Sequence, residues 1–263
     1  MASILDHYIG HGDHVQWLTQ RHQQNQLPST MIFQGPTGVG KKLLVRGFLQ
    51  KLVCEKSQEK PCGVCSHCLR VLEEQNEMVF ELGVDGKKNI SVAQVRELHE
   101  ALALKSMRGF RFVIIDPADR LSRQAANSLL KVLEESPEGT HFFLITDRVF
   151  GILPTIRSRA HILTFGRMTS AELEQKWGSL ELLSWAGGRF DQAERLKEAE
   201  TVEYLNKSIQ LLYALVNDQP QDWKKKAPWF FSHEEWRRFC FFIWNQCLEK
   251  RLFKIDQDLD WLP

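Results

Sequence analysis

The 263-residue chain lacks the features that mark several large classes of protein. No stretch approaches the ~18 consecutive apolar residues of a membrane span. Residues 1–8 lack the basic segment and apolar run of a secretory signal. A surplus of charge is missing too: the net charge is +1, so no overall field attracts nucleic acid or anionic membrane. We therefore expect a cytoplasmic protein whose contacts with nucleic acid, where it has any, come from a local patch or from partners.

The sequence also has no internal repeat and no low-complexity segment. Its composition, 43% hydrophobic and 25% charged, is that of an ordinary soluble globular protein. The length suits one large domain or two to three smaller ones. The six cysteines indicate a metal site or free thiols more than disulfides, because disulfides are rare in the cytoplasm.

A glycine-rich loop joins an apolar run to a helical pattern at residues 32–48. Its glycines, Gly35, Gly38 and Gly40, would let successive backbone N–H groups converge on a phosphate. Lys41 would add a positive charge near the β- and γ-phosphates, and the following helix would add its N-terminal dipole. The pattern predicts a strand, a P-loop and a helix.

Two residues on which ATP hydrolysis depends are missing. The residue after the P-loop lysine should be Ser or Thr, whose hydroxyl holds Mg²⁺, but it is Lys42. Asp116 ends a buried strand, where a Mg²⁺-associated carboxylate belongs, but the water-polarising Glu expected next is replaced by Pro117. We expect no efficient ATP hydrolysis by this chain. Two interpretations of the loop stay open: it binds nucleotide, or it survives as a structural turn.

Along the first two thirds of the chain, continuous apolar runs are separated by segments with a helical pattern. Strands are predicted at 31–34, 78–82, 112–116, 142–145 and 161–165. Such runs suit strands buried on both faces, so the pattern predicts an α/β domain with a parallel sheet. Between the strands, Ser91 and Ser122 are predicted helix caps. The buried stripe of the second helix is predicted at Ala125, Ala126, Leu129, Leu130 and Leu133.

Strand signals stop near residue 169, and only helical patterns follow, one of them predicted at 180–185. We therefore predict three domains: residues 1–167 with an insertion at 54–68, a small helical domain at 168–200, and an all-helical domain at 201–263.

Four cysteines lie within the insertion: Cys54, Cys62, Cys65 and Cys68. Two C-x₂-C steps can hold one tetrahedral ion, and His67 is a possible substitute ligand. Free surface thiols would be an oxidation liability, and an iron–sulfur cluster is the stronger rival. We favour one structural zinc ion, because four protein ligands leave no open position. Cys240 and Cys247 lie on an apolar helix, where we predict core positions.

Two basic segments have more than one interpretation. Arg157 and Arg159 are either solvated or complete a phosphate site on a neighbouring molecule, and the residues alone leave this open. Lys224 to Lys226 lie between Trp223 and Trp229. Such a run can bind phosphates and stack on bases, but we favour a solvated loop.

Residues 9–196 resemble the AAA+ clamp-loader subunits of bacterial DNA polymerase III, in particular the delta-prime family, and three elements carry the resemblance most specifically. They are the cysteine insertion after the P-loop helix, the helix-forming segment 121–137, and residues 156–160, which are similar to the family's Ser-Arg-Cys motif. The resemblance implies an AAA+ P-loop domain followed by a helical lid and a helical, collar-like domain. The chain is short for the family, so we expect a reduced collar.

The resemblance also implies roles for single residues. Arg159 corresponds to an arginine finger that reaches the ATP site of a neighbouring subunit, and Ala160 replaces the usual cysteine. Thr146 stands at the sensor 1 position. The sensor 2 position falls on Asp191, an acid that would repel a γ-phosphate, although Arg189 is only two residues away.

The implied function is that of a non-hydrolysing, stator-like subunit. Its partners would be the motor (tau/gamma) and delta subunits and, through the complex, the sliding clamp and primed DNA. The first alternative is an ATP-hydrolysing motor subunit that uses Lys41 and Asp116. The second is a zinc-dependent nucleic-acid-binding module that uses the cysteines and the lysine-rich loop.

Overall fold

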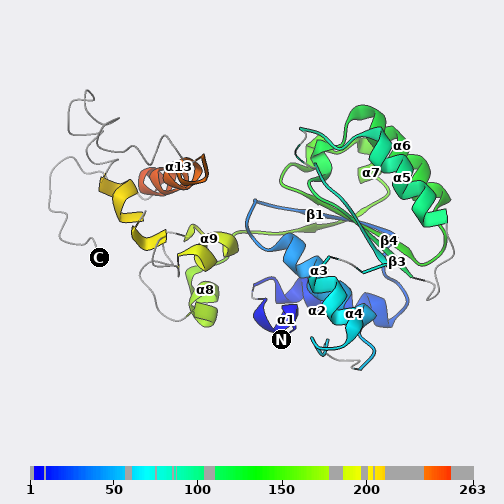
Figure 1. Ribbon diagram of the computed structural model, residues 1–263, viewed down its shortest axis with the longest axis horizontal. Coiled ribbons are helices and arrows are strands. Elements are labelled where there is room, and N and C mark those ends of the chain that lie inside the picture. Colours follow the sequence, from blue (N-terminus) through cyan, green and yellow to red (C-terminus); the bar gives the residue numbers. More distant parts are fainter. Residues whose placement is uncertain are drawn as a thin grey trace. The chain divides into compact units, whose positions relative to one another are not determined.

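The chain divides into two compact units, residues 1–168 and 169–263, which are described separately below (Figure 1). The computed structural model describes residues 3–8, 10–56, 61–74, 76–84, 86, 88–103, 110–177, 186–196, 201–203, 205–210 and 234–249. The predicted helix at 180–185 and the lysine-rich loop at 224–226 lie outside these residues. The further division of the second unit at residue 200 stays a prediction.

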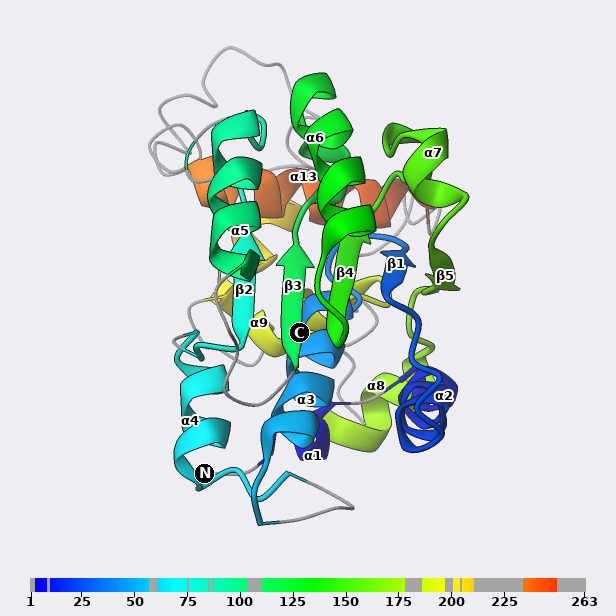
Figure 2. The ribbon, with the colours of Figure 1, turned by 90° about the vertical axis from the view of Figure 1, so that its right-hand side faces the viewer.

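The first unit is built on five parallel strands, as predicted. In chain order they are β1 (Thr30–Gln34), β2 (Val79–Leu82), β3 (Arg111–Ile115), β4 (Thr140–Thr146) and β5 (His161–Thr164). Side by side their order is β2-β3-β4-β1-β5 (Figure 2). Each neighbouring pair is parallel. Phe33 of β1 is in register with Ile145 of β4 on one side and with Leu163 of β5 on the other.

Helices cover both faces of this sheet (Figure 1). One face carries α1 (Ile4–His7), α2 (Gly12–Gln23), α3 (Lys41–Val53) and α4 (Ser66–Leu72). The other carries α5 (Val92–Ala103), α6 (Arg123–Glu135) and α7 (Pro154–Arg157). Successive strand residues point to opposite faces. Phe33 and Phe143 therefore join the first core, whereas Ile32 and Leu144 join the second.

Two predicted helix caps are confirmed, and one predicted stripe is corrected. Ser91 and Gln94 form a reciprocal capping box before α5. The Ser122 hydroxyl accepts the Ala125 N–H at 3.1 Å before α6. Along α6 the sheet-facing row is centred on Ala125, Leu129 and Val132. Val132 is therefore buried, and the predicted Leu130 and Leu133 flank the row half-buried.

The second unit is helical in its described part. Its helices include α8 (Ser170–Trp177), α9 (Phe190–Arg195) and α13 (Glu234–Glu249), and residues 201–203 and 205–210 are also helical. Cys240 is fully buried, as predicted, while the Cys247 side chain lies outside the described residues. Every helix in the described part of the chain is too short or too polar to span a lipid bilayer.

The junction between β1 and the P-loop requires a glycine. The Gly35 N–H donates to the Thr146 carbonyl at 3.1 Å, and the residue has φ +152°. A Cβ at this position would lie 2.3 Å from the carbonyl oxygen of Phe165. Since that oxygen belongs to the backbone following β5, neither the Phe165 carbonyl nor the backbone at residue 35 can move away without disturbing the sheet.

We therefore expect Gly35→Ala to lower the free energy of unfolding by about 2–5 kcal/mol, through backbone strain and steric overlap. Urea unfolding followed by circular dichroism measures this change. Gly166→Ala is the matched control, because a Cβ there meets nothing within 4 Å; it should change the free energy by less than about 0.5 kcal/mol. Equal effects of the two substitutions would contradict the prediction.

Candidate functional site

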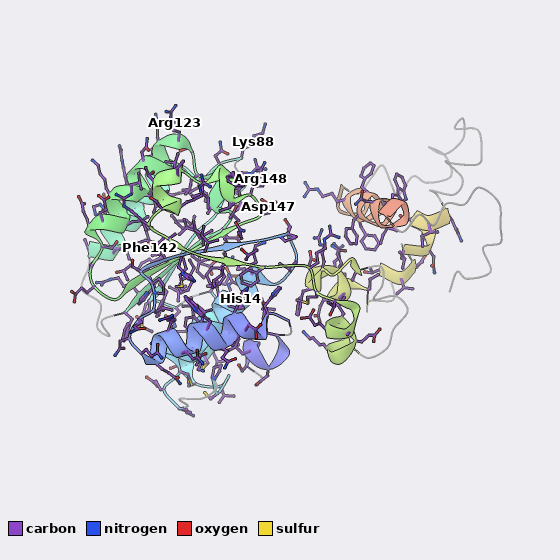
Figure 3. All side chains as sticks on the ribbon, turned by 180° about the vertical axis from the view of Figure 1, so that it is seen from behind. His14, Lys88, Arg123, Phe142, Asp147 and Arg148 are labelled. Carbon is purple, nitrogen blue, oxygen red and sulfur yellow. The ribbon has the colours of Figure 1, made fainter. Side chains whose placement is uncertain are left out.

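The predicted phosphate-site residues meet at one edge of the sheet. Parallel strands end at the same edge, which is where ligands bind in open α/β sheets. The P-loop follows β1, Asp116 follows β3, and Thr146 ends β4. Figure 3 shows Asp147 and Arg148 at this edge, whereas Phe142, near the start of β4, lies inside the layered core.

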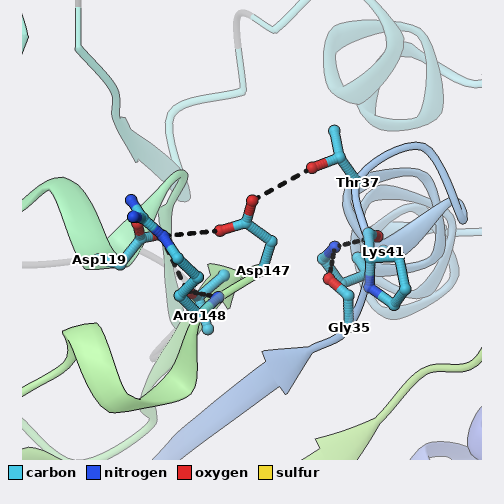
Figure 4. Close-up of polar contacts among 8 residues, drawn as sticks. Gly35, Thr37, Lys41, Asp119, Asp147 and Arg148 are labelled. Atoms are coloured by element: carbon cyan, nitrogen blue, oxygen red, sulfur yellow. Dashed lines mark hydrogen bonds and ion pairs between the residues drawn. The ribbon is translucent and has the colours of Figure 1, made fainter. Parts of the chain in front are cut away.

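Lys41 is turned back onto its own loop. Its Nζ donates to the carbonyl oxygens of Gly35 at 2.6 Å and Pro36 at 2.7 Å (Figure 4). The residue is 7% exposed. Burial lowers the pKa of Lys41, and nearby carboxylates, chiefly that of Asp116, oppose this shift. The lysine is therefore held by the loop itself.

The loop backbone retains the shape that a phosphate requires. Gly38 and Gly40 have φ +82° and +89°, in the left-handed region that favours glycine. Gly40 directly precedes the 13-residue helix α3. The backbone N–H groups at such a helix start, together with the helix dipole, form a favourable anion site. The loop thus fits a phosphate group.

The same edge does not fit Mg²⁺. Lys42, which stands where a hydroxyl ligand is needed, forms an ion pair with Glu81 at 2.8 Å. Burial raises the pKa of Asp116, while the positive charges of Lys42 and Lys41 oppose this shift. Mg²⁺ prefers several oxygen ligands, but an ammonium group occupies one of the positions that should supply them.

Glu81 binds a second cation as well. Arg46 Nη2 lies 2.8 and 3.0 Å from the two carboxylate oxygens, and Arg46 Nε lies 3.2 Å from Oε1. Burial raises the pKa of Glu81, but the hydrogen bonds from Lys42 and Arg46 outweigh it, so the pKa is lowered overall. The sequence interpretation missed Glu81, although it is the one charged residue in β2.

The Thr146 hydroxyl is engaged within the chain. It donates to Asp119 Oδ1 at 2.9 Å and accepts the Arg148 N–H at 2.9 Å. Arg148 Nη2 donates to Asp119 Oδ2 at 2.8 Å. The Asp119 side chain is only 2% exposed. Asp119 and Arg148 were not predicted, but both closely follow strand ends at the functional edge, which is a usable signal.

A further contact connects the P-loop with the end of β4. Thr37 Oγ1 lies 3.4 Å from Asp147 Oδ2, and Asp147 Oδ1 lies 3.6 Å from Arg148 Nε (Figure 4). The polar groups of this edge therefore bind one another across two neighbouring loops.

The two arginines at the end of α7, Arg157 and Arg159, have different environments. Arg159 lies just beyond α7 and is exposed, with Nη1 donating to the Thr155 carbonyl at 3.0 Å and Nη2 3.3 Å from Glu134. The Arg157 guanidinium lies 5.0 Å from the centre of the Phe150 ring. Arg159 is thus the more exposed of the two arginines, with its guanidinium at the surface of the first unit.

The predicted sensor 2 position lies in the second unit. Asp191 binds Arg189 through two contacts, at 3.0 and 2.6 Å, around the start of α9. The acid at this position therefore engages Arg189, the arginine two residues before it.

The four cysteines of the insertion come together as predicted. The sulfur atoms of Cys54, Cys62, Cys65 and Cys68 all lie within 4.8 Å of one another. Four thiolates around a tetrahedral zinc ion are about 3.8 Å apart. Cys54 follows the end of α3 and Cys65 precedes α4. The group could hold a metal ion.

Local hydrogen bonds favour the metal-binding form of part of this cluster. The backbone N–H groups of Val64 and Cys65 lower the pKa of the Cys62 thiol, and the thiolate is the form that binds metals. Burial raises the pKa of Cys68. His67, predicted as a substitute ligand, lies outside the group, and its Nε2 is 3.1 Å from Glu55. His67 precedes Cys68 by one residue on α4, so the two side chains point about 100° apart around the helix axis.

Most of the first unit matches a known protein family. The family described as "DNA polymerase III, delta subunit" matches residues 10–169, which is more than half of the chain. The chain belongs to this family.

Two curated relatives and one solved structure are also similar to this chain. The chain is 32% identical over 148 residues to the DNA polymerase III subunit delta' of Haemophilus influenzae, covering 56% of this chain. It is 31% identical over 193 residues to subunit tau of Bacillus subtilis, covering 67% of this chain. It spans less than half of these relatives, 45% and 34% respectively.

The solved structure is a DNA polymerase III gamma subunit-related protein from Thermotoga maritima. It has a TM-score of 0.52 and 20% identity over 90% of this chain and 71% of its own length. At this identity the likeness shows the fold.

The ion pairs of Glu81 predict a dependence on pH. The pKa of Glu81 in the folded chain is below its ordinary value of 4.5. Its contribution to stability is therefore complete above about pH 4.5 and is lost as the pH falls through the folded-state pKa. At pH 7, Glu81→Gln should lower the free energy of unfolding by about 1–3 kcal/mol. Urea unfolding from pH 7 to 3 should show this difference shrink.

Glu77→Gln is the matched control, because Glu77 is 72% exposed and 3.9 Å from Arg70. Its effect should stay below about 1 kcal/mol. A Glu81→Gln difference that is constant from pH 7 to 3 would show that the carboxylate charge is not the cause.

Proposed function

We propose that this chain is a non-hydrolysing, stator-like delta-prime subunit of a cytoplasmic DNA polymerase III clamp loader. With motor (tau/gamma) and delta subunits it would help load the sliding clamp on primed DNA. Residues 168–200 would form the lid and 201–263 a collar-like domain. The observation that carries the proposal is the Lys42–Glu81 ion pair, which replaces a metal ligand with a fixed positive charge. Membership of a DNA polymerase III family supports the proposed clamp-loader assembly.

In this proposal the functional chemistry is carried by Arg159 and takes place on a neighbour's nucleotide. Its two contacts, to the Thr155 carbonyl and to Glu134, are at the exposed surface. Exposed pairs of this kind contribute about 0–1 kcal/mol, so releasing the guanidinium costs little. A guanidinium then stabilises the negative charge that develops during phosphoryl transfer. The chain's own P-loop then need not support ATP hydrolysis.

The second candidate is a motor subunit with ATPase activity of its own. The similarity to subunit tau of B. subtilis over 67% of this chain favours it. Against it stand Lys42 and Pro117, since neither can hold a metal or polarise a water. The glycines of the loop and Lys41 are compatible with nucleotide binding without turnover.

Arg159→Ala should leave folding and assembly intact but slow ATP hydrolysis at the one neighbouring site that it serves. Loss of a trans arginine lowers turnover on the order of 10³-fold. Single-turnover hydrolysis by the assembled clamp loader, together with clamp loading on primed DNA, measures this effect.

Arg70→Ala is the matched control: Arg70 is 48% exposed, against 50% for Arg159, and each pairs with one carboxylate among the residues that the structure describes. Normal hydrolysis and loading with Arg159→Ala would refute the proposal. Robust turnover by the isolated chain, abolished in Lys41→Ala, would favour the motor subunit.

The metal proposed for the cysteine group is one structural zinc ion. Four sulfur ligands close the coordination sphere, so the ion would join the end of α3 to the start of α4 and take no part in chemistry. An iron–sulfur cluster uses the same donor atoms. No other cofactor is required by this proposal.

The purified chain should contain one zinc ion, and Cys68→Ser should lose it and unfold at a lower temperature. Elemental analysis and thermal unfolding with and without a chelator measure both effects. Cys240→Ser is the control, because Cys240 is equally buried but lies in the second unit. Iron with visible absorbance, in place of zinc, would contradict the assignment.

A further inference from the structure

The most exposed large apolar side chain in the described part of the chain lies close to the proposed arginine finger. Phe150 belongs to η2 (Val149–Gly151), and it is 87% exposed. The next most exposed, Phe241 and Val64, reach 58% and 55%. Single apolar residues at a surface need no explanation. Phe150 is different because the loop around it is firmly held.

The contacts of this loop hold it on both sides of the phenylalanine. Before it, Arg148 binds the buried carboxylate of Asp119 at 2.8 Å. After it, a Cβ on Gly151 would lie 2.8 Å from Asp119 Cβ, so the backbone packs directly on that side chain. Ile152 is 3% exposed and anchors the loop in the core. The outward position of Phe150 is therefore a property of a braced loop.

An arginine already lies against the exposed ring. The Arg157 guanidinium is 5.0 Å from the ring centre, within the range of a cation–π contact. Its Nε is buried and has no hydrogen-bond partner among the described residues. Among the described residues, the Arg157 guanidinium therefore packs on the Phe150 ring. Arg159 is two residues further along the chain, just beyond α7, so the turn that meets the aromatic ring leads directly to the proposed finger.

We propose that Phe150 is the apolar anchor through which this subunit docks on the neighbouring ATPase subunit when Arg159 reaches that subunit's nucleotide. This inference rests on the proposed function of Arg159. The partner surface must offer an apolar pocket with negative charge at its rim, from carboxylates or from the nucleotide itself. Arg157, which lies against the ring, supplies the complementary positive charge.

This composition is that of an interface hot spot. Aromatic residues and arginine are enriched at such sites, and a few of them dominate the binding free energy. A rigid, preorganised ring loses little freedom on binding. The two residues then have separate roles: Phe150 provides affinity, and Arg159 acts on the phosphate.

The test titrates the full chain into a complex of motor and delta subunits and measures the dissociation constant by fluorescence anisotropy. Phe150→Ala should raise this constant about 30-fold, whereas Phe150→Leu should restore most of the affinity. At saturating concentration, Phe150→Ala should support normal ATP hydrolysis. Phe110→Ala is the matched control, because Phe110 is 48% exposed but precedes β3, at the opposite end of the sheet.

Arg159→Ala separates this inference from the proposed function. It should bind like the unmodified chain and lose hydrolysis at the neighbouring site. If Phe150→Ala binds normally, the inference is wrong, whatever Arg159→Ala does. If Phe150→Ala binds weakly but Arg159→Ala hydrolyses ATP normally, the proposed function fails. If Phe150→Ala abolishes self-association of the isolated chain and leaves the complex intact, the occupant is a second copy, and the inference is overturned.

Discussion

The placement of β1 between two parallel neighbours is the constraint on which the rest of the first unit depends. The Gln34 carbonyl accepts the Phe165 N–H at 2.8 Å, and the Gly35 N–H donates to Thr146 at 3.1 Å. The P-loop therefore leaves the sheet from a point fixed on both sides. Because all five strands are parallel, the groups that follow β3 and β4 converge on the same edge. The position of the loop therefore follows from the sheet.

Charge pairing within the chain fills the positions that phosphate chemistry would use. Lys42 and Arg46 neutralise Glu81, and Lys41 donates to carbonyls of its own loop. Lys41 is the buried member of this set, and a buried charge is costly unless it is hydrogen-bonded. The loop carbonyls supply those hydrogen bonds. This explains how the loop can keep its shape without the metal ligands that hydrolysis requires.

Local patterns predicted the elements of the fold well. The helix predicted directly after the P-loop is α3 (Lys41–Val53), and the apolar run predicted to end at Asp116 is the buried strand β3 (Arg111–Ile115). Periodicity and capping act over a few residues, so one sequence is enough to read them. The cysteine group was predictable for the same reason, since its spacing alone brings the sulfurs together.

Partners that are distant in the sequence were not predictable in this way. Lys42 meets Glu81, and Asp119 meets Arg148, because β2, β3, β4 and β1 lie in a particular order. Hydrophobic pattern indicates that strands exist and are buried, but the order of a parallel sheet is set by long crossover connections. The roles of Glu81 and Asp119 follow from that order. The same carboxylate of Asp119 holds the Thr146 hydroxyl and braces the loop that carries Phe150. Turning Thr146 inward and holding the loop in place are therefore two consequences of one buried carboxylate.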